Sequence, residues 1–218
     1  VLCSATIPPS LGARVGLPAG EYDELDVGSP FDYEHNALLY CAIHMADPRT
    51  PQYAAAVHDE LVALITAAGG RTLALFTSWK AMDNAAEAVR ARVKVPILTQ
   101  RDLPKTALVK AFSDDEHACL FATAGFFQGV DIPGRTLSLV IIDRIPFPRP
   151  DDPLLSARPK AVDEAGGSGF RALSAPRAGL LLPPRPGRPP PGVDARGAVP
   201  LLAPPPAPAP PAPPPPPP

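Results

Sequence analysis

Short apolar segments alternate with helix-forming segments along the chain, and this alternation constrains the fold more than any other feature. Residues 71–77 form a short apolar run that stops at Ser78, as a buried strand of a parallel sheet would. Residues 81–93 are rich in Ala, Glu and Arg, which favour a helix, and Pro96 prevents that helix from continuing. We expect further strands at residues 37–42, 95–99, 118–123 and 137–143, and further helices at residues 53–68 and 104–112.

This order of elements predicts an α/β fold with an open, mostly parallel sheet covered by helices on both faces. In such a fold, ligands bind beyond the carboxyl ends of the strands. The sequence therefore directs attention to the positions just after Thr77, Thr123 and Asp143.

Charge and composition exclude several classes of protein. The net charge is −2 and no polybasic arm is present, so a nucleic acid would have to be held by a local site. No apolar run reaches the roughly 18 residues of a membrane span, so we expect no membrane partner and a cytoplasmic location. Cys3, Cys41 and Cys119 contain no CxxC pair, which argues against a disulfide scaffold or zinc, and we expect Cys3 to be a buried, inert thiol.

The last 36 residues differ from the rest, because 19 of the 34 prolines lie in residues 183–218. Proline lacks a backbone N–H and fixes φ, so we expect no helix or central strand there and a disordered or polyproline II tail. Two interpretations of the tail stay open. It is a frame-shifted reading of GC-rich coding sequence, or a genuine tail that binds an aromatic-lined groove.

Residues 122–134 directly follow a predicted strand and carry the most informative chemistry. Gly125 and Gly129 allow the backbone to approach a phosphate or sugar closely. Thr123 offers a hydroxyl, and Asp131 can accept a hydrogen bond from a ribose. An ordinary loop, with Asp131 as a turn or cap residue, explains the same local pattern.

The pattern Ala-Thr-x-x-Phe-x-x-Gly-x-Asp-x-Pro-Gly in residues 122–134 resembles motif V of the DinG/XPD-like superfamily 2 DNA helicases. The resemblance covers residues 1–182. Four further segments agree with it: residues 1–6 look like motif III, residues 75–78 like motif IV, and residues 29–33 and 140–153 like segments of the bacterial DinG branch.

The resemblance implies a remnant of a first motor domain with its linker at residues 1–28, a second RecA-like helicase domain at residues 29–182, and the Pro-rich tail at residues 183–218. Such a helicase couples ATP hydrolysis, with Mg²⁺, to movement along single-stranded DNA. The chain has no Gly-x-x-x-x-Gly-Lys-Ser/Thr phosphate loop and no spacing for the family's Fe–S cluster. It also does not begin with Met. We therefore expect a fragment that is inactive without the missing N-terminal motor domain.

The family also implies roles for individual residues. Thr77, Ser78 and Thr123 are assigned to the DNA backbone, since hydroxyls bind phosphates of every sequence alike. Ser78 also suits a helix N-cap. Trp79 and Phe127 either stack on bases or belong to the core.

On the nucleotide side, the resemblance assigns ATP binding to Gly129 and Asp131. Arg188 is the remaining candidate for an arginine that reaches the γ-phosphate, although prolines on both sides of it prevent the helix that would direct it. We assign no metal ligand, because the four histidines show no metal-ligand spacing. A non-catalytic interaction module that presents the polyproline tail is the alternative function.

Overall fold

The computed structural model describes residues 2–3, 11–18, 20–28, 33–127, 137–145, 147, 152–174 and 197–202. By its contacts the chain divides into two units, residues 1–35 and residues 36–218. In the first unit, α1 (Leu11–Arg14) is a single helical turn that brings Gly12 against the ring of Tyr22. The sequence also predicts domain boundaries after residue 28 and after residue 182, and these two boundaries stay predictions.

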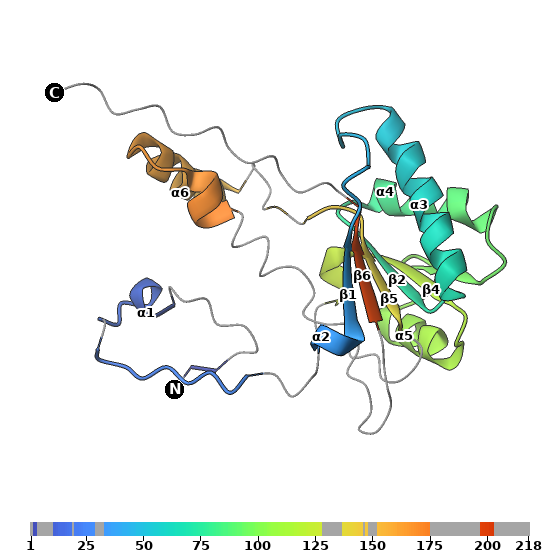
Figure 1. Ribbon diagram of the computed structural model, residues 1–218, viewed down its shortest axis with the longest axis horizontal. Coiled ribbons are helices and arrows are strands. Elements are labelled where there is room, and N and C mark those ends of the chain that lie inside the picture. Colours follow the sequence, from blue (N-terminus) through green and yellow to red (C-terminus); the bar gives the residue numbers. More distant parts are fainter. Residues whose placement is uncertain are drawn as a thin grey trace. The chain divides into compact units, whose positions relative to one another are not determined.

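The second unit contains the sheet and its helices (Figure 1). Its elements, after α2 (Tyr33–Asn36) at the boundary, are β1 (Ala37–Cys41), α3 (Gln52–Ala68), β2 (Thr72–Phe76), α4 (Trp79–Arg90), β3 (Ile97–Thr99), α5 (Lys105–Asp114), β4 (Cys119–Thr123), the 3₁₀ turn η1 (Ala124–Phe127), β5 (Leu139–Ile142), α6 (Pro153–Glu164), the π-helical turn η3 (Phe170–Ser174) and β6 (Gly197–Leu201).

The six strands form one sheet in the order β1-β6-β5-β2-β4-β3, and every pairing between neighbours is parallel. The expected α/β fold is therefore confirmed, and all five strands expected from the sequence are present. Each differs from its expected bounds by at most two residues at either end.

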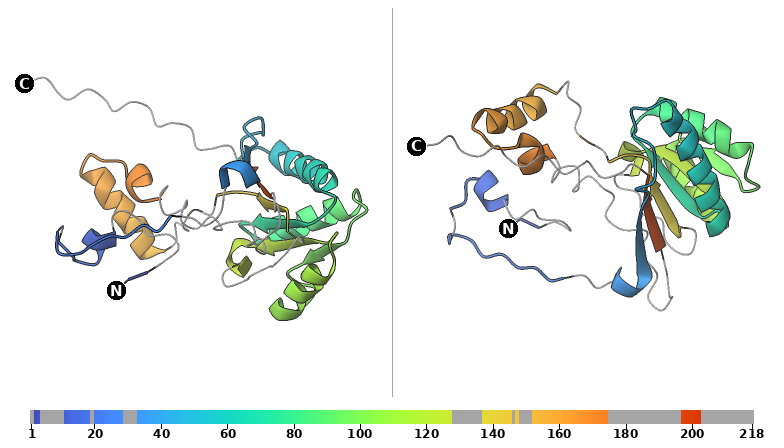
Figure 2. Two further views of the ribbon diagram at one scale, coloured as in Figure 1. Left: turned by 60° about the horizontal axis from the view of Figure 1, so that its bottom comes forward. Right: turned by 45° about the horizontal axis from the view of Figure 1, so that its top comes forward.

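Side chains of β2 alternate between two cores, because successive residues of a strand point to opposite faces. Ala74 and Phe76 belong to the core that includes buried residues of α3 and α4. Leu73 and Leu75 belong to the core that includes buried residues of α5. Helices thus cover both faces, with α3 and α5 on opposite sides of the sheet (Figure 2).

Local signals define the ends of the two helices beside β2. Gly69 adopts a left-handed conformation (φ 66°), and the N–H of Gly70 donates to the carbonyl of Ile65 at 3.1 Å, which closes α3. Ser78 caps α4, since its hydroxyl oxygen accepts from the N–H of Ala81 at 3.2 Å. The cap interpretation of Ser78 is therefore confirmed.

The strand β6 corrects one expectation. Residues 197–201 lie in the region where the prolines predicted no central strand, yet they pair with β1 and with β5. Of these residues only Pro200 lacks an N–H, and the flanking Val199, Leu201 and Leu202 are apolar. Leu202 is fully buried in the core shared with α3 and α4. The apolar run dominates the local structure there, whereas the other residues of 183–218 lie outside the described part.

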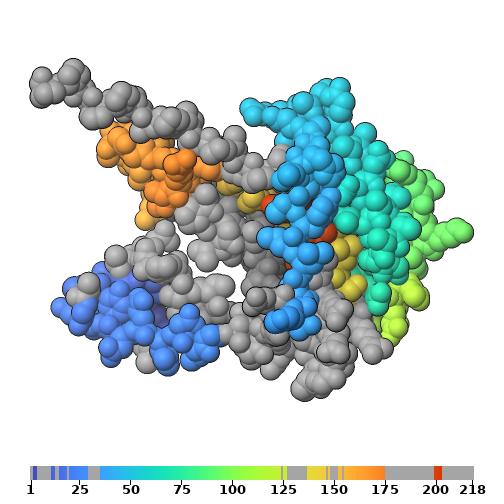
Figure 3. Space-filling model, in the orientation of Figure 1, coloured from blue at the N-terminus to red at the C-terminus, as the bar shows by residue number. Residues whose placement is uncertain are grey.

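β1 is an edge strand with a largely exposed surface, in keeping with its place at one end of the sheet. Leu38 and Leu39 are 65% and 69% exposed. Figure 3 shows β1 and the segment that follows it at the surface of this view. No helix within the described residues is long and apolar enough to cross a membrane.

Candidate functional site

Parallel strands bring Thr77, Thr123 and Asp143 to one edge of the sheet, because each follows or ends a strand at its carboxyl end. β2 lies between β4 and β5, so these three positions belong to adjacent strands. The three places to which the sequence directed attention therefore lie side by side at one edge of the sheet, and their roles stay predictions.

At the end of β2, Thr77 and Ser78 are both exposed. The Ser78 oxygen accepts the cap hydrogen bond from Ala81, which leaves its hydroxyl proton able to donate outward. The first N–H groups of a helix have no partner within the helix and carry partial positive charge. Ser78 and the start of α4 together therefore suit an anionic oxygen such as that of a phosphate.

Thr123, at the end of β4, is held differently. Its N–H and its hydroxyl both donate to Oε1 of Gln100, at 2.8 and 2.9 Å. The N–H of Gln100 in turn donates to the carbonyl of Phe121 at 3.0 Å. The single hydroxyl proton of Thr123 is thus used within the protein.

Asp143, at the end of β5, is a buried carboxylate that is only 4% exposed. The hydroxyl of Tyr53 donates to the Asp143 backbone carbonyl at 3.1 Å, and lies 3.4 Å from Oδ1. Oδ2 accepts no hydrogen bond within the described residues. Burial raises the pKa of Asp143, although Arg144 and the Tyr53 hydroxyl act in the opposite direction.

Arg144 covers this pair. Its guanidinium carbon lies 4.7 Å from the centre of the Tyr53 ring, and Nε lies 3.8 Å from Oδ2 of Asp143. Burial, followed by the charge of Asp143, raises the pKa of Tyr53 to about 12, so Tyr53 keeps its proton and remains a donor near neutral pH.

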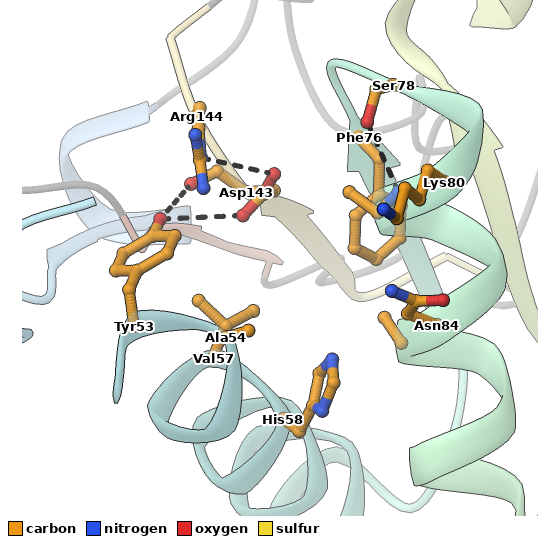
Figure 4. A pocket seen from close by; sticks show the side chains of 12 residues that line it. Tyr53, Ala54, Val57, His58, Phe76, Ser78, Lys80, Asn84, Asp143 and Arg144 are labelled. Atoms are coloured by element: carbon orange, nitrogen blue, oxygen red, sulfur yellow. Dashed lines mark hydrogen bonds and ion pairs between the residues drawn. The ribbon is translucent and has the colours of Figure 1, made fainter. Parts of the chain in front are cut away.

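A cavity of about 220 Å³ lies beside Asp143, between α3 and α4 (Figure 4). Burial lowers the pKa of His58 in its wall, which keeps that imidazole neutral near pH 7. The cavity is lined by Tyr53, Ala54, Val57, His58, Phe76, Ser78, Lys80, Ala81, Asn84, Ala85, Asp143 and Arg144.

Trp79 is 43% exposed at the start of α4, so it is not the core residue that one interpretation made it. The guanidinium carbon of Arg101 lies 4.6 Å from the centre of its ring. Arg101 is held in turn by Asp83, at 3.0 Å. One face of the indole is therefore already covered by a cation.

Several expected site residues lie outside the described part of the chain. These are Gly129, Asp131 and Arg188, and the side chain of Phe127 is not described either. Within the described residues, no group of three or more His, Cys, Asp and Glu side chains could hold a metal ion. Cys3 is exposed, which corrects the expectation of a buried thiol, and its described neighbour Leu2 is 61% exposed as well.

Sequence reasoning missed the roles of Gln100 and of Tyr53. The sequence directed attention to Asp143, which is a single carboxylate at the end of an otherwise apolar strand. The sequence did not predict which residue contacts Asp143. Tyr53 lies among the buried residues of α3.

An all-parallel sheet with helices on both faces and polar residues at its carboxyl edge is an open α/β domain, and its likeness to solved helicase domains makes the fold RecA-like. Comparison with known families is more specific. Residues 61–183 match the family model of the helicase C-terminal domain, and the chain belongs to this family.

Known proteins agree with this assignment. The chain is 50% identical, over 209 residues, to the ATP-dependent helicase DinG of Mycobacterium tuberculosis, a match that covers 93% of this chain and 32% of that protein. It is 38% identical to the ATP-dependent DNA helicase YoaA of Escherichia coli, covering 86% of this chain and 29% of YoaA. A solved XPD helicase has a similar fold, with a TM-score of 0.53 and 18% identity over 76% of this chain and 31% of that one.

The resemblance to DinG/XPD-like helicases is therefore confirmed, and the chain spans about a third of the length of the curated relatives it matches. The extent of the resemblance needs correction. Residues 1–182 are only about 83% of the 218 residues, so a match over 93% extends beyond residue 182. The similarity includes the region of β6, where the sequence interpretation saw none.

Proposed function

We propose that this chain is the second motor domain of an ATP-dependent DNA helicase similar to DinG, which couples ATP hydrolysis to translocation on single-stranded DNA. The proposal is supported most directly by the exposed Thr77–Ser78 pair at the start of α4, beside the carboxyl edge of the sheet. A hydroxyl donor at a helix N-terminus binds phosphate irrespective of the base, as a translocase requires.

Thr77, Ser78 and Thr123 are the proposed contacts to the DNA backbone. Ser78 is the most informative of the three, because its hydroxyl proton is not used by its cap hydrogen bond. Thr123 has to turn its hydroxyl away from Gln100 before it can donate to a phosphate.

On the nucleotide side, Gly129 and Asp131 are proposed to face ATP and Arg188 to approach its phosphates. The remaining ATP and Mg²⁺ ligands, and the family's Fe–S ligands, belong in this proposal to a preceding motor domain of the same polypeptide. The proposed location is the cytoplasm. We do not propose the interaction-module alternative, because β6 incorporates part of the Pro-rich region into the sheet.

Binding to fluorescein-labelled single-stranded DNA, followed by anisotropy, tests the Ser78 contact. We compare Ser78→Asn with Ser78→Asp, because both residues cap helices well but only Asp places a negative charge against a phosphate. We expect Ser78→Asp to weaken binding by about tenfold or more relative to Ser78→Asn.

Equal binding by the two variants contradicts the assignment of Ser78 to the DNA backbone. Thermal melting of both variants is the control, since equal stability excludes loss of the cap as the cause.

ATPase activity provides the second test. We expect none from this chain alone, and activity when a DinG-type first motor domain is joined to it.

A further inference from the structure

The lining of the cavity between α3 and α4 includes a carboxylate oxygen to which none of the described residues donates a hydrogen bond. Oδ2 of Asp143 is buried and accepts no hydrogen bond from any described residue. The nearby Nε of Arg144, at 3.8 Å, is too distant for one. A buried acceptor without a donor costs free energy, so Asp143 is suited to a ligand that brings an N–H group.

Part of the cavity lining is apolar and suits the face of a ring. This part includes Ala54 of α3, Ala81 and Ala85 of α4, and Phe76 of β2. Figure 4 shows Ala54 and Phe76 at the cavity. The volume of about 220 Å³ is several times the roughly 30 Å³ that one water occupies in the liquid. The cavity, called the slot below, therefore has room for an aromatic ring.

The charges around the slot favour a ligand attached to a phosphate. Ser78 and Lys80 stand at its α4 side, and Arg144 is 43% exposed on its β5 side. Among the described residues that line the slot, Asp143 is the only carboxylate. Lys80 and Arg144, two cations in the lining, disfavour a basic peptide side chain and suit a nucleotide.

We propose that this slot takes one base of the bound DNA strand, turned out of the stack, whose exocyclic amino group donates to Oδ2 of Asp143 while its phosphate lies at the start of α4. A carboxylate is the side chain that accepts from the amino group of cytosine. The inference deepens the proposed function and rests on it, because the same strand contacts Ser78. The slot should give DNA binding a modest preference for certain bases, whereas the contacts to the DNA backbone are independent of sequence.

Oligo-dC and oligo-dU test the slot directly. The two bases have the same ring size and differ at the exocyclic position, where cytosine carries an amino group and uracil an oxygen. We expect the chain to bind fluorescein-labelled oligo-dC roughly five- to tenfold more tightly than oligo-dU of equal length near neutral pH. We expect Asp143→Asn to bring this ratio to about one or below, because its amide can donate to the uracil oxygen.

A second pair of variants separates the slot from the fold. Ala54→Leu places a larger side chain in the slot, whereas Ala55→Leu makes the same change at an exposed neighbour on α3 that does not line it. We expect the dC to dU ratio to fall to about one in Ala54→Leu and to stay at the wild-type value in Ala55→Leu.

The outcomes distinguish the slot from the proposed function. Equal affinity of the unmodified chain for oligo-dC and oligo-dU overturns the slot and leaves backbone binding intact. A wild-type ratio in both Asp143→Asn and Ala54→Leu overturns it as well. Absence of binding to either oligonucleotide overturns the proposed function and the slot together.

Discussion

Gln100 receives two hydrogen bonds from Thr123, one from the backbone N–H at 2.8 Å and one from the hydroxyl at 2.9 Å. The two residues follow or end adjacent strands, β3 and β4, at the carboxyl edge of the sheet. The Gln100 side chain therefore extends the hydrogen bonding between β3 and β4 beyond the last residue of β3.

We expect Gln100→Leu to lower the free energy of unfolding by about 1–3 kcal/mol, because it leaves the partly buried N–H of Thr123 without an acceptor. Thr123→Val removes only the hydroxyl bond and should cost about 1 kcal/mol. Urea denaturation measures both, and the double variant should show coupling between the two positions. Additive losses would mean that the two side chains do not interact.

Gly69 and Gly70 provide a matched pair at the end of α3. Both have positive φ, at 66° and 89°, but a Cβ on Gly70 would overlap the backbone carbonyl of His117 while one on Gly69 meets nothing. We expect Gly69→Ala to cost about 1 kcal/mol from backbone strain alone, and Gly70→Ala to cost roughly 3 kcal/mol or more. Thermal melting compares them, and equal losses would contradict the close approach at Gly70.

Local patterns were sufficient for most of the sheet. β2, β4 and β5 are buried on both faces, so their residues form continuous apolar runs that stand out in the sequence. β6 was missed because the prolines of residues 183–218 dominate that region's composition and conceal a short apolar run. A window limited to residues 197–202 contains one proline and would have permitted a strand at that place.

The candidate site was predictable in position but not in its contacts. The rule that parallel strands present ligands at their carboxyl ends was enough to select Thr77, Thr123 and Asp143. The contact between Tyr53 and Asp143 joins residues 90 positions apart, and no local pattern specifies such a pair. The slot also depends on alanines of two different helices that line it together, which is a property of packing.

Asp143 should make the stability of the protein depend on pH. Burial raises its pKa in the folded chain above the ordinary value of 3.8, so the folded state binds this proton more tightly than the unfolded state does. Its contribution to stability is therefore complete below pH about 3.8, and is lost as the pH rises through the raised folded value. The ionised carboxylate is a cost near pH 7.

We accordingly expect Asp143→Asn to melt at a higher temperature than the unmodified chain at pH 7, with the difference shrinking as the pH falls toward 4. Asn has a similar shape and keeps the backbone carbonyl to which Tyr53 donates. Comparing the two proteins at each pH cancels the titration of the other acids. A difference that stays constant across this range would contradict a raised pKa for Asp143.

Pro200 interrupts the sheet at one defined point. The N–H of Leu202 donates to Ile142 of β5 at 3.0 Å, and residues two apart on a strand face the same neighbour. The missing N–H of Pro200 therefore faces β5, and the pairing between β5 and β6 is recorded at Ala198 and Leu201 but not between them. The opposite side of β6 pairs with β1 without a gap.

We expect Pro200→Val to raise the free energy of unfolding by about 0.5–1.5 kcal/mol, because it supplies a ladder hydrogen bond and a β-branched side chain at a buried strand position. Part of this gain is offset by the greater freedom of the unfolded chain once the proline is removed. Leu202→Ala is the companion variant. It should cost about 2–5 kcal/mol, since Leu202 is fully buried. Urea denaturation of both variants tests whether β6 belongs to the sheet, because a strand detached in solution would leave both substitutions without effect.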